Sequence, residues 1–194
     1  MEFKTHLTEA WELTLEFIAP LVILTLVMFL VWFLSFGILV PVTFAGYIYS
    51  ILLMLRQGRE PKIQDLFSQL NLFLPLFGFA IIACIITAIG LFFLVFPGII
   101  LALIIAFVCF YMIPLMVDNE LGLFEAIKES YSLAMQGNFL DHIVAVIVFI
   151  GMIAVGSSVF IGSLFTQPLA TIFLLSIYGE KIRLRPANGD RPKQ

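Results

Sequence analysis

The sequence contains few charged residues. Asp, Glu, Lys and Arg make up 12% of its 194 residues, whereas an ordinary soluble domain has about 25%. None of these residue types occurs in the stretches 17–55, 66–117 and 143–179. With 62% hydrophobic residues and a mean hydropathy of +1.12, a chain of this length cannot bury its apolar surface in a core of its own. The composition excludes a soluble domain and predicts an integral membrane protein.

The sequence also lacks the residue patterns that catalysis, redox chemistry and ion transport use. Transport of ions or protons usually shows as ionisable residues inside the spans, and the charge-free stretches hold none. Cys84 and Cys109 stand alone in apolar runs, without the spacing of a metal site or a redox pair. No nucleophile elbow, paired carboxylates or nucleotide-binding loop is present. We therefore expect no enzyme, no cofactor, no metal and no nucleic-acid partner.

Proline and glycine punctuate the long apolar stretches. A helix that crosses a bilayer needs about 20 apolar residues, and Pro41, Pro97 and Pro168 divide stretches that are about twice that length. We predict an all-α polytopic membrane protein with six transmembrane helices. They form three Pro-turn hairpins, with turns at Pro41, at Pro97-Gly98 and at Pro168. The sixth segment, from Pro168 to Gly179, is short for a full span.

A short amphipathic segment precedes each predicted hairpin. Residues 2–16, 62–70 and 122–137 place apolar side chains at helical spacing. Such helices lie in the membrane interface, where Trp11 would reach headgroup depth. Near the start of the next span, Asp141 beside His142 is better explained as a helix N-cap than as an acid–base pair. The expected apolar face of the first segment consists of Phe3, Leu7, Ala10, Trp11 and Leu15.

Internal similarity supports this division of the chain. Aligning residues 9–11 with 65–67 puts Pro41 in register with Pro97. We predict a single integral membrane domain, 1–185, made of pseudo-repeats at about 1–60, 61–120 and 121–185, and a disordered tail at 186–194. All ten Lys and Arg residues lie away from the three turns. The positive-inside rule then places both termini in the cytoplasm.

The middle of the chain carries an ordered set of short motifs. Phe-Pro-Gly-Ile-Ile-Leu-Ala at 96–102 is followed by Pro-Leu-Met-Val-Asp at 114–118, by Gly-Leu-Phe-Glu-Ala-Ile-Lys-Glu-Ser at 122–130 and by Gly-Asn-Phe at 137–139. Over about residues 90–140 this order resembles the bacterial membrane domain that is fused to some glycerophosphodiester phosphodiesterases, together with its uncharacterised stand-alone relatives. A Pro-Gly turn, a span that returns to a proline and an acidic residue, and a Glu/Asp-Ala-x-x-x-Ser helix recur in that family.

The resemblance implies a bacterial cytoplasmic (inner) membrane protein with a role in envelope homeostasis or beside a transporter. The family's phosphodiesterase chemistry belongs to a separate soluble domain that is absent from this sequence, so no catalytic residue carries over. The candidate functional or interaction residues are those of the motifs, namely Pro97, Gly98, Pro114, Asp118, Glu125, Ala126, Lys128 and Ser130.

Two functions remain open from the sequence. The first is a non-catalytic scaffold or accessory subunit of the cell envelope, which contacts membrane lipids and another membrane protein or a second copy. The alternative is a transporter or channel-like protein for a lipid, a peptide or another amphipathic solute. Small residues at every fourth position favour close helix packing. They are Ala80, Cys84 and Ala88 in the third predicted span, and Ala154, Ser158 and Gly162 in the fifth.

Overall fold

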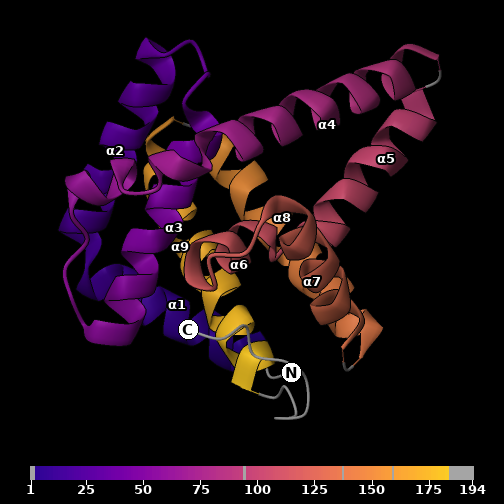
Figure 1. Ribbon diagram of the computed structural model, residues 1–194. Helices are drawn as coiled ribbons and strands as arrows, with labels where there is room; N and C mark the ends of the chain where they lie inside the picture. The colour runs from indigo at the N-terminus through magenta and orange to yellow at the C-terminus, as the bar shows by residue number, and fades with distance from the viewer. Residues whose placement is uncertain (1–2, 94, 137, 159, 184–194) are drawn as a thin grey trace.

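The protein is a bundle of helices from which one helical hairpin projects (Figure 1). The computed structural model describes residues 3–93, 95–136, 138–158 and 160–183, and all regular elements in these ranges are helical. The elements are α1 (Phe3–Glu16), α2 (Ile18–Leu34), α3 (Val40–Gln57), the 3₁₀ turns η1 (Ile63–Phe67) and η2 (Leu70–Leu72), α4 (Phe73–Phe93), α5 (Val95–Val108), α6 (Met112–Asp118), α7 (Leu123–Met135), α8 (Phe139–Ser157) and α9 (Phe160–Arg183).

Several helical stretches have the length and composition of membrane spans. Ile63–Phe92, Val95–Asp118 and Phe139–Ser157 qualify individually among the described residues. Helices α1 and α2, which meet at a bend of 88°, qualify if they are taken together. This confirms an all-helical chain with apolar segments long enough to cross a membrane.

Helices α3 and α9 form the centre of the bundle. From Leu169 to Tyr178 every side chain of α9 except Ser176 is buried. Helix α9 packs against α8, α1 and α2, while α3 packs against η1, α6 and α2. Side chains of α9, with Phe173 and Tyr178 among the largest, therefore fill the interior.

Two of the predicted proline turns lie slightly off position. The first connection occupies residues 35–39, where Phe36 and Gly37 have positive φ values of 50° and 83°, and Pro41 stands in the first turn of α3. Likewise α4 ends at Phe93, and Pro97 stands in the first turn of α5. Proline suits these places because the first helical N–H groups have no partner within the helix. These prolines begin helices instead of forming the turns.

The predicted turn at Pro168 is wrong. Pro168 lies inside α9, which is 24 residues long, so the expectation of a short sixth segment is wrong as well. Helix α8 already ends at Ser157. There the hydroxyls of Ser157 and Ser158 both donate to the Ala154 carbonyl, and such local hydrogen bonds compete with the helix ladder. The small-residue set 154, 158 and 162 is thus divided between α8 and α9.

The second amphipathic segment is not an α-helix. Residues 63–67 and 70–72 form the 3₁₀ turns η1 and η2 instead. The Asp65 carboxylate accepts hydrogen bonds from Ser50, Arg59 and the Lys62 backbone N–H, which pulls the segment onto α3. A Cβ atom on Gly46 would lie 2.3 Å from the η1 backbone, so glycine permits this contact. The other two amphipathic segments form α1 and α7.

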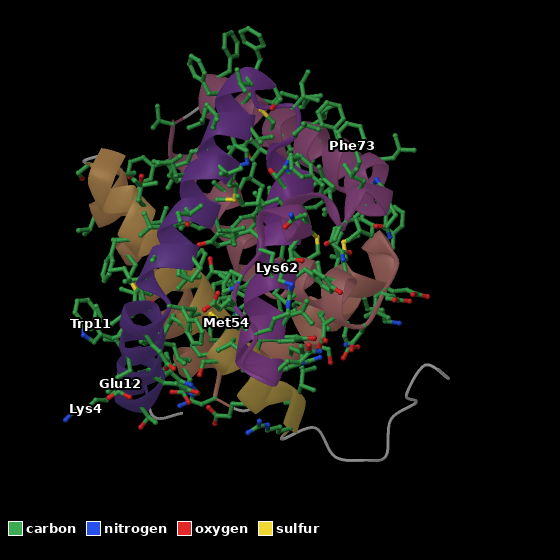
Figure 2. The ribbon with its side chains drawn as sticks, turned by 90° about the vertical axis from the view of Figure 1, so that its left-hand side faces the viewer. Lys4, Trp11, Glu12, Met54, Lys62 and Phe73 are labelled. Carbon is green, nitrogen blue, oxygen red and sulfur yellow. The ribbon has the colours of Figure 1, made fainter. Side chains whose placement is uncertain are left out.

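Helix α1 packs on the bundle with only part of its expected apolar face, since Ala10 is buried and Phe3 contacts the core. Its buried side chains are His6, Ala10 and Thr14, whereas Leu7, Trp11 and Leu15 are exposed. Trp11 lies on the outer side of the helix in Figure 2 and is 47% exposed. The first segment therefore keeps an unburied apolar stripe. The predicted tail at 186–194 and Gly137 lie outside the described residues.

Candidate functional site

The motif residues lie at two separate places. Pro97 and Gly98 belong to the tip where α4 meets α5, at the upper right of Figure 1. Pro114 and Asp118 belong to α6, and Glu125, Ala126, Lys128 and Ser130 belong to α7. Helices α6 and α7 lie lower in the figure, away from that tip. The eight residues therefore do not form one site.

At the tip the two helices touch through backbone. A Cβ atom on Gly98 would lie 2.5 Å from the Leu91 nitrogen, and one on Gly90 would lie 2.9 Å from the Gly98 Cα. Real Cβ contacts are essentially never this short. Glycine at both positions thus permits the close crossing of α4 and α5, while Pro97 beside it is exposed.

Ser130 belongs to a buried polar cluster that supplies hydrogen bonds at a break in the span Val95–Asp118. Helix α5 stops at Val108 and α6 starts at Met112. Across the break, the Ser130 hydroxyl donates to the Val108 carbonyl at 2.6 Å and accepts from the Tyr111 N–H at 3.1 Å. Interruptions of a membrane helix are tolerated where neighbouring side chains satisfy the released backbone groups. Ser130 has this role.

His142 of α8 forms hydrogen bonds to residues on both sides of the same break. Its Nε2 lies 3.0 Å from the Phe107 carbonyl, and its Nδ1 lies 3.3 Å from the Tyr111 hydroxyl. Because a carbonyl only accepts, Nε2 carries the proton and Nδ1 accepts from the tyrosine. The expected N-cap Asp141 is wrong, since Asn138 caps α8 by accepting from the Leu140 N–H. His142 is a residue that the sequence analysis missed.

Asp118 joins three helices. Its carboxylate accepts two hydrogen bonds from the Arg56 guanidinium of α3 and one, at 2.9 Å, from the Tyr178 hydroxyl of α9. The carboxylate is nearly buried, whereas the arginine is about half exposed. Hydrogen bonding to Asp118 raises the pKa of Arg56 further. Paired forks of this kind fix orientation as well as distance, so Asp118 holds α3, α6 and α9 in register.

Lys181 fastens the end of α7 to α9. Its ammonium donates to the Leu133 carbonyl at 2.6 Å and to the Gln136 carbonyl at 2.9 Å, and it lies 5.9 Å from the centroid of the Tyr111 ring. The last carbonyls of a helix lack partners within the helix, and lysine is well suited to them. Burial lowers the pKa of Lys181, which the carboxylates of Asp141 and Glu180 oppose.

A fourth polar cluster docks α1 onto α9. His6 Nε2 lies 2.5 Å from a Glu180 oxygen, and His6 Nδ1 lies 2.7 Å from the Ser176 hydroxyl, which donates to Glu9 at 2.8 Å. Ser, His and Glu in contact are also the set of a hydrolase triad. Here, however, Ser176 lies inside α9, where backbone N–H groups serve the helix and do not face an oxyanion. We assign this cluster to helix docking.

The remaining motif residues divide by burial. Ala126 and Pro114 are buried and pack in the bundle, while Glu125 and Lys128 are exposed on the surface of α7. In the part of the chain that the structure describes, no three His, Cys, Asp or Glu side chains are placed to hold a metal ion. The polar clusters around Ser130, Asp118, Lys181 and His6 join helices to one another.

The projecting hairpin carries an extensive exposed apolar surface. In the hydrophobic window of Ile63–Phe92 only 6% of the residues are buried. The side of α4 that includes Ile82, Ile85 and Ile89 is exposed, as is the side of α5 that includes Ile100, Leu103 and Ile104. We call these six residues the outer face of the hairpin, which comprises the sides of α4 and α5 that point away from the space between them. Exposed apolar surfaces of this kind contact lipid or another protein.

No family model, curated protein or solved structure matches this chain.

Proposed function

We propose that the protein is a non-catalytic scaffold or accessory subunit of a bacterial cytoplasmic membrane. In this proposal α2–α3, α4–α5 and α8–α9 are three membrane hairpins with six spans. Helix α1 and the charged end of α9 lie together at the bottom of Figure 1, opposite the α4–α5 tip. The basic residues of that end favour the cytoplasmic side. The 88° bend between α1 and α2 suits an α1 that lies along the membrane surface.

The exposed α4–α5 hairpin is the observation that carries this proposal. A hairpin that served only to complete the bundle would bury one side of each helix against it, yet almost none of the α4 window is buried. Meanwhile the polar clusters of Ser130, Asp118 and Lys181 hold α6, α7 and α9 in fixed places. A fixed base with a projecting apolar arm is the arrangement expected of a protein that holds a second membrane protein.

A transporter or channel-like protein for an amphipathic solute is less well supported. Such a protein needs a passage along the membrane normal that connects the bound solute first to one side of the membrane and then to the other. The central helix α9 is buried along Leu169–Tyr178. Its buried side chains fill the interior of the bundle, where such a passage would run.

The experiment is purification from native membranes in a mild detergent, with the molar mass of the complex measured by light scattering. We expect a discrete assembly heavier than the 21.8 kDa chain, containing a second membrane protein or a second copy. The variant Ile85→Asn, on the outer face, is expected to lose that assembly. Ile147→Asn is the control, because Ile147 is equally apolar and 62% exposed on α8. A strictly monomeric wild-type protein without a partner would refute the proposal.

A further inference from the structure

The connection between α2 and α3 forms an apolar tip of the bundle, which we call the α2–α3 tip (residues 33–40). Figure 1 shows it at the top of the molecule, at the end opposite to α1 and the charged end of α9. Four large apolar side chains of the tip are exposed, and Phe36 is exposed to 95%; the other three are Phe33, Leu34 and Ile38. The tip therefore presents hydrocarbon to its surroundings.

The backbone of this tip makes its own hydrogen bonds. Each N–H group from residue 35 to residue 40 has an acceptor within residues 31–37, at distances of 2.9–3.3 Å. Pro41, which follows, has no N–H group. Irregular backbone is excluded from hydrocarbon because its polar groups find no partner there. The N–H groups of this turn meet that requirement without water.

The polar side chains of the tip are paired internally as well. Trp32 Nε1 donates to the Thr43 hydroxyl at 2.8 Å, and that hydroxyl donates to the Leu39 carbonyl at 2.7 Å. The Ser35 hydroxyl donates to the Trp32 carbonyl at 3.4 Å and accepts from the Leu39 N–H at 3.3 Å. Residues 31–43 contain no other side chain with a hydrogen-bond donor. The side-chain donors of the tip thus do not need water either.

The side chain at position 36 also fits a non-aqueous medium. Among the described residues other than glycine, Phe36 and Glu120 have positive φ values, of 50° and 51°. This backbone region favours glycine, asparagine and aspartate, so neither side chain suits its conformation. Glu120, which lies just beyond α6 in the charged part of the chain, exposes a carboxylate, whereas Phe36 exposes an aromatic ring. At a similar φ the chain therefore carries opposite side chains at the two places.

The length of the helices sets the depth of the tip. The 17 residues of α2 rise about 26 Å, and α3 rises about 24 Å from Val40 to Arg56. Glu16 at the end of α1 is exposed, and its charge keeps the start of α2 at the near boundary of the hydrocarbon. The hydrocarbon core is about 30 Å thick, and the bilayer with its headgroups is about 40–45 Å thick. A tight turn adds less than about 7 Å, so the tip ends inside the far leaflet.

We propose that the α2–α3 tip lies among the acyl chains of the far leaflet and does not emerge into water. The proposal rests on the membrane placement in the proposed function and refines its first hairpin, which enters and leaves the bilayer from the charged side. Phe33 and Leu34 are adjacent in α2, so their side chains diverge by about 100°. The exposed groups thus surround the tip. Acyl chains contact such a tip from all sides, whereas a protein partner covers one side.

The test measures the collisions of a nitroxide label with two relaxing agents, in the full chain in lipid nanodiscs. The label is attached to Phe36→Cys, in a background in which Cys84 and Cys109 are replaced by alanine. Molecular oxygen concentrates in hydrocarbon, whereas a polar nickel chelate stays in water. Relative to a label at Gln57→Cys, which is exposed at the charged end of α3, we expect more collisions with oxygen. Collisions with the chelate should fall at least about tenfold, because unpaired polar groups are strongly disfavoured in hydrocarbon.

The two agents together separate the possible surroundings of the tip. Frequent oxygen collisions with rare chelate collisions at position 36 support the proposal. Chelate collisions as frequent as at position 57 would place the tip in water and overturn it. Rare collisions with both agents would show a protein contact in place of lipid and would overturn it too. Phe33→Cys gives the same outcomes if Phe36→Cys does not fold. A protein that proves monomeric in detergent refutes the scaffold but leaves these collision rates unchanged.

Asparagine at position 36 provides a matched variant. In water, Phe36→Asn would stabilise the protein, because asparagine tolerates this backbone region better than phenylalanine. In hydrocarbon its unpaired amide destabilises the protein instead, so we expect unfolding in bicelles at a lower concentration of dodecyl sulfate. Glu120→Asn, at the other residue with positive φ, is the control and is expected to unfold at the wild-type concentration or above it. A higher unfolding concentration for Phe36→Asn would overturn the proposal.

Discussion

Replacing Ser130 by alanine tests whether one buried hydroxyl holds the α5–α6 break. The side chain is fully buried, and its oxygen serves both the Val108 carbonyl and the Tyr111 N–H. Ser130→Ala would leave these two backbone groups buried and unpaired. Each such group costs about 1–3 kcal/mol, so the free energy of unfolding should fall by about 2–6 kcal/mol.

The measurement is reversible unfolding in mixed micelles with increasing dodecyl sulfate, followed by circular dichroism. Ser132→Ala is the matched control, because Ser132 lies two residues further along the same helix and is exposed. Its effect should stay within about 0.5 kcal/mol. If the two variants lost the same stability, or if Ser130→Ala lost less than about 0.5 kcal/mol, the assignment of Ser130 to the break would be refuted.

Three further substitutions test other contacts by the same unfolding measurement. Gly46→Ala should lower stability by about 1–3 kcal/mol, because the added methyl group meets the η1 backbone. Gly151→Ala, in α8 with open space around it, should instead stabilise by up to about 1 kcal/mol, and equal effects would contradict the close contact. Tyr178→Phe removes one hydrogen bond to the Asp118 carboxylate and should cost about 1.5–3 kcal/mol; an unchanged midpoint would argue against that bond. Lys181→Met leaves the last α7 carbonyls without their ammonium partner and should lower the free energy of unfolding by about 1–3 kcal/mol. Amide hydrogen exchange at the end of α7 should also become faster, and unchanged exchange there would contradict the role given to Lys181.

The sequence was sufficient for the helical class and for the apolar segments because these depend on composition and local pattern. The charge-free stretches predicted helices of membrane length, and α4, α5 and most of α8 lie within them. Proline was a less reliable guide. Pro97 begins a helix, but Pro168 continues one, and the two differ in tertiary surroundings that a single sequence does not reveal.

The polar clusters were beyond sequence reasoning because each joins residues far apart in the chain. The motif at 114–118 indicates Asp118, but its partners Arg56 and Tyr178 are about 60 residues away in either direction. Neighbouring residues on a helix point in different directions, so Asp141 gives no indication of the role of His142, which contacts a carbonyl on another helix. The sequence does contain one indication of the role of His142. This histidine stands at the edge of an apolar run, where a buried polar group needs a hydrogen-bond partner.

The central proposal is that the outer face of the α4–α5 hairpin binds a second membrane protein. The most direct test places a photoreactive amino acid at position 85 of the full chain in native membranes, with position 147 as the control. We predict that irradiation gives one discrete protein adduct from position 85 and none from position 147, both sites being exposed and apolar. Lipid adducts alone at both positions would contradict the proposal.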